Sequence, residues 1–207
     1  IDGGHLKVLN WIENELKNLY DKTKFSCYLG NIQDKGTVDF LMKKYSVDTI
    51  YHTAAYKHVP IVEDNIIEAV KNNILGTKIL ADIAVKNNVK TFVLISSDKA
   101  VRPTNYMGAT KRFSELLIKA KANDRGKTNF SIVRFGNVMG SSGSVIPLFK
   151  RQISQGGPVT VTDKKIVRYF MTIREAVQLV IQAGALSNGG DIFILDFDYH
   201  IKYDSSG

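Results

Sequence analysis

The chain has 207 residues, a hydrophobic fraction of 44%, one cysteine and a formal net charge of +8. This length suits a single domain, 1–207, with a sizeable core. One cysteine excludes a disulfide framework within the chain and suits a reducing compartment. No apolar run approaches the roughly 20 residues of a membrane helix, and the first residues lack the apolar core of a signal peptide. The basic residues form no aromatic–basic stripe, so we do not expect nucleic-acid binding. The missing signal-peptide core and the single cysteine favour a cytoplasmic protein.

In chain order, stretches with helical periodicity alternate with short apolar runs rich in β-branched residues, which indicate strands. The predicted helices are 6–20, 37–45, 66–88, 107–120, 145–155 and 173–185, and the predicted strands are 25–29, 47–53, 91–96, 130–134, 159–162 and 191–195. Cys27 is expected to be buried in the first of these strands. The alternation predicts an α/β fold, a Rossmann-like doubly wound parallel sheet with helices on both faces.

Three polar side chains, Ser97, Asp98 and Lys99, come directly after the strand predicted at 91–96. Open α/β sheets bind ligands at the carboxyl ends of their strands, so a hydroxyl, a carboxylate and an amine at this point favour a functional site. For these three residues alone, a solvated turn in which Ser97 caps the local backbone is the more common explanation.

A dinucleotide-binding fold normally opens with a strand, a G-x-G-x-x-G loop and a helix that holds the pyrophosphate. The printed sequence has no such loop, because the glycines at 136, 140 and 143 have another spacing and favour a loop that lines a substrate. We therefore expect an N-terminally truncated fold in which the first strand and the glycine loop are missing. Asp2 would then take the place of the acidic residue that grips the adenosine ribose.

Five segments together carry a family resemblance: 51–60 (YHTAAYKHVP), 73–77 (NILGT), 96–111 (SSDKAVRPTNYMGATK), 134–138 (RFGNV) and 168–172 (RYFMT). The chain resembles the nucleotide-sugar 4,6-dehydratases of the CapD-like polysaccharide biosynthesis group, which are extended short-chain dehydrogenases/reductases. The resemblance implies NAD rather than NADP as cofactor. It also implies a UDP-N-acetylhexosamine, usually UDP-N-acetylglucosamine, as substrate and a 4-keto-6-deoxy sugar for bacterial polysaccharide or glycan synthesis as product.

By the same resemblance, Asp98 is the acid at the C6 oxygen, Lys99 the base at C5, and Ser97 a hydrogen-bond partner of the C4 oxygen. For these roles Asp98 must be protonated, which requires a raised pKa, and Lys99 must be neutral. Short-chain dehydrogenases generally place Tyr-x-x-x-Lys on one helix face, and here Met107 stands four residues before Lys111. This methionine resembles the long, membrane-associated branch of the dehydratases. Tyr106 lies about 140° around the helix from Lys111 and is not expected to replace the tyrosine.

The remaining candidate residues are implied to bind ligands. Those assigned to the cofactor are Asp2, Asn31, Ile32, Ala54, Ala55, Tyr56, Asn73 and Lys111. Those assigned to the UDP-sugar are Lys57, Asn137, Ser144, Val145 and Arg168, so that 137–172 contributes the nucleotide-sugar pocket. No metal-binding motif is present.

Two other functions stay open at this point. A nucleotide-sugar 4-epimerase would share the scaffold and the cofactor, but would need neither an acid at C6 nor a base at C5. A non-catalytic fragment or scaffold unable to hold NAD is the other alternative. The resemblance also implies a homo-oligomer and, for a longer parent protein, a place at the cytoplasmic face of the inner membrane.

Overall fold

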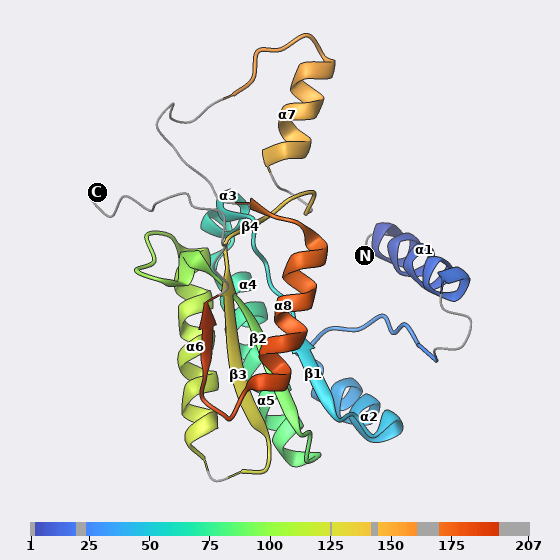
Figure 1. The fold of residues 1–207 in the computed structure, drawn as a ribbon, viewed down its shortest axis with the longest axis vertical. Helices are drawn as coiled ribbons and strands as arrows, with labels where there is room; N and C mark the ends of the chain where they lie inside the picture. Colours follow the sequence, from blue (N-terminus) through green and yellow to red (C-terminus); the bar gives the residue numbers. More distant parts are fainter. Residues whose placement is uncertain (1–2, 20–23, 125, 142–144, 161–169, 195–207) are drawn as a thin grey trace.

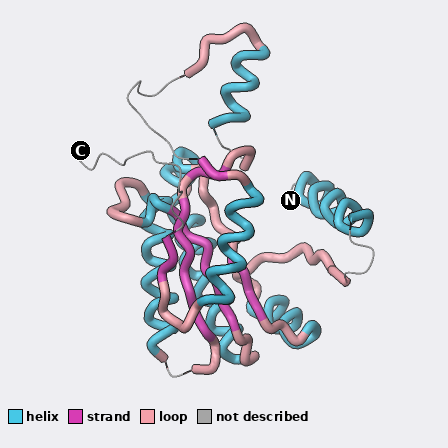
Figure 2. Tube along the Cα trace, viewed as in Figure 1, coloured by secondary structure: helices cyan, strands magenta, loops and turns pink. Residues whose placement is uncertain are grey.

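The computed structural model describes residues 3–19, 24–124, 126–141, 145–160 and 170–194 (Figures 1 and 2). Its helices are α1 (Gly3–Leu19), α2 (Lys35–Tyr45), α3 (Val59–Asp64), α4 (Ile66–Ala69), the π-helix η1 (Val70–Gly76), α5 (Thr77–Lys86), the 3₁₀ turn η2 (Asp98–Ala100), α6 (Tyr106–Asn123), α7 (Val145–Ser154) and α8 (Ile173–Leu186). Its strands are β1 (Thr49–His52), β2 (Thr91–Ser97), β3 (Asn129–Phe135), β4 (Asn137–Val138), β5 (Phe170–Met171) and β6 (Ile192–Ile194).

The main sheet has four parallel strands in the order β1-β2-β3-β6, and β4 and β5 form a separate parallel pair. Side chains of successive strand residues point to opposite faces, and the core divides accordingly. Phe92 and Leu94 pack with residues of α2, α5 and α6 on one face, whereas Val93 packs with Ala183 of α8 on the other. Figure 1 shows α8 in front of the sheet and α5 behind it. The predicted doubly wound parallel sheet is therefore confirmed.

Most predicted elements are present within a few residues of their expected bounds, and the strand predicted at 25–29 is not. Residues 24–30 are extended without strand pairing, and Cys27 is only partly buried. A strand needs a neighbour to accept and donate its hydrogen bonds, and within the described residues β1 pairs with β2 alone. Residues 159 and 160 are likewise not in a strand, and 161–162 lie outside the described part.

The long helix predicted at 66–88 is divided into α4, η1 and α5. The backbone of the middle piece is hydrogen-bonded as a π-helix, an arrangement that often marks functional sites. The side chain that keeps this irregular piece in place is Asn73, described below.

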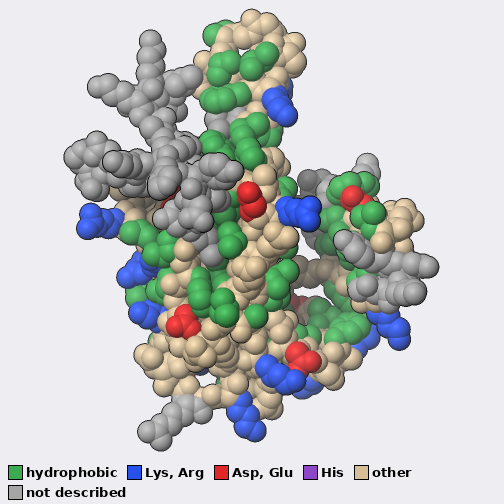
Figure 3. Space-filling model, in the orientation of Figure 1, with side chains coloured by type: hydrophobic (Ala, Val, Ile, Leu, Met, Phe, Trp, Pro, Cys, Tyr) green, Lys and Arg blue, Asp and Glu red, His purple; other side chains and the backbone are tan. Residues whose placement is uncertain are grey.

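The positive charge is spread over the face of the molecule shown in Figure 3. Figure 3 shows Lys and Arg side chains scattered over the visible face of the molecule, with no single basic patch. In the part of the chain that the structure describes, no helix is both long enough and apolar enough to cross a membrane.

Candidate active site at the carboxyl edge of the sheet

The three polar residues that follow β2 form one hydrogen-bonded group. Ser97 Oγ donates to Asp98 Oδ1 at 2.8 Å and accepts from the Lys99 backbone N–H at 3.2 Å, so it caps η2. Lys99 Nζ lies 3.0 Å from Asp98 Oδ1. Because β1, β2 and β3 are parallel, their carboxyl ends share this edge with the group. The predicted proximity of hydroxyl, carboxylate and amine is thus present in the fold.

The charge state of Asp98 differs from what an acid at C6 requires. Burial pushes the pKa of Asp98 upward, but the Ser97 hydrogen bond and the charge and hydrogen bonds of Lys99 outweigh it and bring the pKa below its usual value. The side chains of Asp98 and Lys99 are 44% and 32% exposed, so water also solvates the pair. The expected rise in the pKa of Asp98 is therefore absent, and Asp98 rests as a carboxylate.

Lys111 lies beneath this group, on the inner face of α6. Its Nζ donates to the Ile95 carbonyl oxygen at 2.9 Å, and the residue is 8% exposed. Burial lowers the pKa of Lys111 to about 8, although the nearby Glu115 carboxylate opposes the shift. At the end of β1, His52 is buried and bonds Thr77 Oγ1 at 2.8 Å. Burial, together with the charge of Lys111, lowers the pKa of His52 to about 4, so this imidazole is neutral.

Met107, one turn before Lys111, is 3% exposed and packs against Val62 and Ala69. A thioether cannot exchange a proton, so this position supplies packing and not an acid or a base. Tyr106 is half exposed at the start of α6, and its backbone N–H donates to Glu63 Oε1 at 2.7 Å. The structure thus separates the environments of Tyr106 and Lys111, as the helical spacing predicts.

Asn73 of η1 connects the loop after β1 to α6. Its Oδ1 accepts from the Tyr56 backbone N–H at 2.7 Å, and its Nδ2 donates to the Tyr56 carbonyl at 3.0 Å and to Thr110 Oγ1 at 2.9 Å. The side chain is almost completely buried, so each of these bonds is protected from water. Asn73 therefore fixes the backbone that follows Ala54 and Ala55 at the site edge.

Lys57, in the same loop, brings a second amine close to Lys99. Burial, and next the charge of Lys99, lower the pKa of Lys57. Its Nζ lies 3.4 Å from Ser141 Oγ, in the loop that follows β4. Asn137, half-buried in β4, begins this loop segment. The loops after β1, β2 and β4 therefore meet at one edge.

The pair Asn31 and Ile32 lies beside η1. Asn31 Oδ1 accepts from the Gln33 backbone N–H at 2.9 Å, which closes a tight turn. A Cβ at Gly76 would be 2.6 Å from Ile32 Cδ1, so the bare glycine lets Ile32 pack directly on this helix. The predicted adenine-binding segment is thus held against the same element that carries Asn73. Asp2, Ser144 and Arg168 lie outside the described residues, and Val145 is described only as the first residue of α7.

Two residues near the site were missed by the sequence reasoning. Glu115 is fully buried and binds Ser96, Arg134 and Arg112, and its position four residues after Lys111 was the available signal. Gly108 was missed as well: a Cβ there would lie 2.3 Å from the Lys99 carbonyl oxygen. Only a glycine allows α6 to approach η2 this closely.

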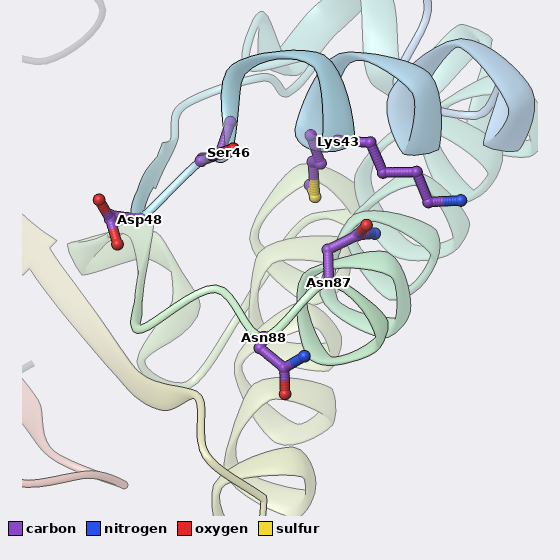
Figure 4. A pocket seen from close by; sticks show the side chains of 7 residues that line it. Lys43, Ser46, Asp48, Asn87 and Asn88 are labelled. Carbon is purple, nitrogen blue, oxygen red and sulfur yellow. The ribbon is translucent and has the colours of Figure 1, made fainter.

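A cavity of about 370 Å³ lies away from this cluster (Figure 4). Its lining includes Ser46, Asp48 and Asn88, which precede β1 and β2, so it opens at the amino end of the sheet. Parallel α/β sheets bind ligands at the opposite end, and we do not assign this cavity to the site. Among the described residues, no group of three His, Cys, Asp or Glu side chains could hold a metal ion.

The doubly wound parallel sheet, with a titratable cluster at its carboxyl edge, defines a Rossmann-type α/β protein. The sequence profile described as "Polysaccharide biosynthesis protein" matches residues 5–203, and the chain belongs to this family.

Relatives with two different reaction names share the family. The chain is 51% identical over 192 residues to the capsular polysaccharide biosynthesis protein CapD of Staphylococcus aureus, covering 92% of this chain and 32% of CapD. It is 37% identical to a UDP-N-acetylglucosamine 4,6-dehydratase (inverting) of Campylobacter jejuni, with coverage of 91% and 58%. It is 38% identical to a UDP-glucose 4-epimerase of Rickettsia massiliae, with coverage of 88% and 53%. The chain thus spans about a third of the length of CapD and little more than half of the other two.

Solved structures agree on the fold. The X-ray structure of Pen from Bacillus thuringiensis superposes with a TM-score of 0.84 at 39% identity, covering 90% of this chain and 57% of Pen. The dTDP-glucose 4,6-dehydratase DesIV from Streptomyces venezuelae, solved with NAD and TYD bound, superposes with a TM-score of 0.80 at 22% identity, covering 88% and 61%. The latter likeness concerns the fold alone.

Proposed function

We propose that this chain carries the catalytic centre of an NAD-dependent UDP-N-acetylhexosamine 4,6-dehydratase, with UDP-N-acetylglucosamine as substrate. The observation that carries the proposal is the contact of Asp98 with Lys99, 3.0 Å apart at the carboxyl edge of β2, above the buried Lys111. Elimination of water from a hexose needs a base and an acid within reach of neighbouring carbons. Lys99 and Asp98, an amine and a carboxyl group at one edge of the sheet, are suited to act as this base and this acid.

The proton balance of the elimination explains why the two groups are paired. Neutral Lys99 takes the proton from C5, which a ketone at C4 acidifies, and protonated Asp98 gives a proton to the C6 oxygen as the C–O bond breaks. One water leaves, and the pair is then an ammonium and a carboxylate. Transfer of one proton from Lys99 Nζ to Asp98 Oδ1 across their 3.0 Å contact restores the acid and the base. The proton that the C4 hydroxyl loses on oxidation balances the proton that C5 takes up when hydride adds at C6.

A nicotinamide cofactor would supply the redox chemistry of the cycle by accepting a hydride from C4 and returning it at C6. The residues present fit its nicotinamide and ribose half. Lys111 offers a buried amine that donates to Ile95, and Asn73 holds the backbone next to the small residues Ala54 and Ala55. Asn31 and Ile32 would contact the adenine, whereas no G-x-G-x-x-G loop in this sequence is available for the pyrophosphate.

The UDP part of the substrate would bind across the loops after β1 and β4. The amine of Lys57 contacts Ser141, so it lies beside the loop that follows Asn137. An ammonium and an amide are suitable partners for phosphate and sugar oxygens. Ser144, Val145 and Arg168 complete the proposed pocket of 137–172.

The second candidate, a nucleotide-sugar 4-epimerase, is favoured by the 38% identity to the Rickettsia enzyme. The test is to express the complete open reading frame that encodes these residues, incubate the protein with UDP-N-acetylglucosamine in D₂O, and follow the sugar by NMR. Conversion of the C6 hydroxymethyl signal to a methyl signal supports dehydration. Inversion at C4 with C6 intact would contradict the dehydratase proposal and support the epimerase.

Two variants separate the proposed roles of the pair. Asp98→Asn keeps the size of the side chain but removes the acid, so the C5 proton should exchange with deuterium while C6 keeps its hydroxyl. Lys99→Met removes the base, so C5 exchange should stop together with loss of the hydroxyl. Equal behaviour of the two variants would contradict the division of labour.

A further inference from the structure

Glu115 is a fully buried carboxylate one helical turn beyond Lys111. Its Oε1 accepts from Ser96 Oγ at 2.7 Å and from Arg134 Nε at 2.7 Å. Its Oε2 accepts from Arg134 Nη2 and from Arg112 Nη1. One carboxylate therefore joins α6 to the ends of β2 and β3, where Ser96 and Arg134 are register partners.

The inner face of α6 contacts the end of β2 at three successive turns. Gly108 lies against the Lys99 carbonyl, Lys111 donates to the Ile95 carbonyl, and Glu115 accepts from the Ser96 side chain. The first two contacts reach only backbone atoms. The third reaches a side chain, that of Ser96, which directly precedes Ser97 in β2.

The ionic character of this contact is by itself weak evidence for a role in stability. Replacing a buried ion pair by apolar residues of similar size is often neutral or stabilising. A carboxylate can, however, accept a guanidinium fork and a hydroxyl at the same time, which no apolar side chain can do. The geometry therefore favours a role in placing Ser96 over a role in stability.

We propose that Glu115 is a positioning residue that acts through Ser96 to hold Ser97, Asp98 and Lys99 in register above Lys111. The catalytic consequence rests on the proposed dehydratase function, whereas the structural consequence does not.

The test is Ser96→Ala, because Glu115→Ala would leave two arginines beside a cavity and could prevent folding. Ser96→Ala removes one hydrogen bond and leaves the Glu115–Arg134 pair intact. The matched control is Ser131→Ala: this serine of β3 is also buried, and its hydroxyl has no partner among the described residues. Both variants are made in the protein from the complete open reading frame.

Two readouts are expected to separate the variants. Amide hydrogen exchange over 97–100 should be at least about fivefold faster in Ser96→Ala than in Ser131→Ala, at equal urea midpoints. With UDP-N-acetylglucosamine, kcat should fall at least about tenfold in Ser96→Ala with KM within twofold, and Ser131→Ala should match the wild type.

Equal exchange in the two variants, or an unchanged kcat in Ser96→Ala, would overturn the role of Glu115. If the wild type does not dehydrate the sugar, the proposed function fails, and the exchange comparison alone still decides whether Glu115 positions this segment.

Discussion

A substitution at Gly108 should disturb the site most directly, because α6 approaches η2 so closely at this residue that a side-chain methyl group has no room. In Gly108→Ala the new Cβ would be 2.3 Å from the Lys99 carbonyl oxygen and 3.2 Å from Pro103 Cβ. Ordinary contact begins near 3.4 Å, so the Lys99 backbone must move by about 1 Å. The obstacle is backbone and not the flexible end of a side chain, so no rotamer change relieves it.

The expected effect is larger on activity than on stability. Overpacking costs about 1 to 3 kcal/mol, and the better helix propensity of alanine returns about 1 kcal/mol. A displacement of about 1 Å of catalytic groups, by contrast, can reduce the rate about 100-fold. We therefore expect kcat for UDP-N-acetylglucosamine to fall about 100-fold while the free energy of unfolding falls by at most about 2 kcal/mol.

Gly36→Ala is the matched control in the first turn of α2, where the nearest atom to a new Cβ is Asp34 Oδ1 at 3.4 Å. That variant should keep wild-type kcat and gain up to about 1 kcal/mol in stability. The assays are steady-state turnover and urea unfolding of both proteins. A kcat for Gly108→Ala within threefold of the wild type would refute the argument that this close approach sets the position of Lys99.

Three further predictions concern charge, polar contacts and cofactor. Lys111→Met should be more stable than the wild type at pH 7 by up to about 3 kcal/mol, since burial lowers the pKa of Lys111 to about 8. Between pH 8 and about 10.5 the unfolded chain binds more protons at this lysine than the folded chain does, so the stability of the wild type should rise with pH toward that of the variant. Urea unfolding of both proteins at pH 7 and 10 tests this, and an unchanged difference in stability would contradict it. Asn73→Ala should lower the free energy of unfolding by about 2 to 4 kcal/mol, because it leaves both Tyr56 backbone groups without their partner. An unchanged urea midpoint would contradict the role of Asn73 in fixing this backbone. Residues 1–207 alone should bind NAD weakly for want of a glycine loop, and calorimetry that gives a micromolar Kd would show otherwise.

Local sequence patterns were sufficient for the elements that depend on local chemistry. The apolar run 91–95 forms most of β2. Helix α6 begins at Tyr106, one residue before the predicted start, and the side chain of Asn105 caps it by accepting from the Gly108 N–H. Residues 25–29 have an equally good strand pattern but stay unpaired, because strand formation depends on a neighbour that no local pattern reveals. The π-helix η1 is a second case, since its Asn73 contacts come from segments 17 and 37 residues away.

The site was predictable only in part for a related reason. Ser97, Asp98 and Lys99 are contiguous, so their proximity follows from the sequence alone. Lys111 was assigned to the site through the resemblance, whereas Glu115, four residues later, has the spacing of an ordinary solvated helix partner. The burial of Lys111 against Ile95 and of Glu115 against Ser96 depends on tertiary packing, which no local pattern reveals.

The low pKa of Asp98 and its proposed role as an acid are reconciled by the exposure of the pair. Water solvates both charges while 44% of the Asp98 side chain and 32% of the Lys99 side chain are exposed. A sugar that covers the pair removes that solvation and disfavours both charged forms together. A single proton moving from Lys99 Nζ to Asp98 Oδ1 neutralises both groups at once and produces the acid and the base that the elimination consumes. In the proposed reaction, the contact that keeps Asp98 ionised in water is thus the path by which it would become an acid under the substrate.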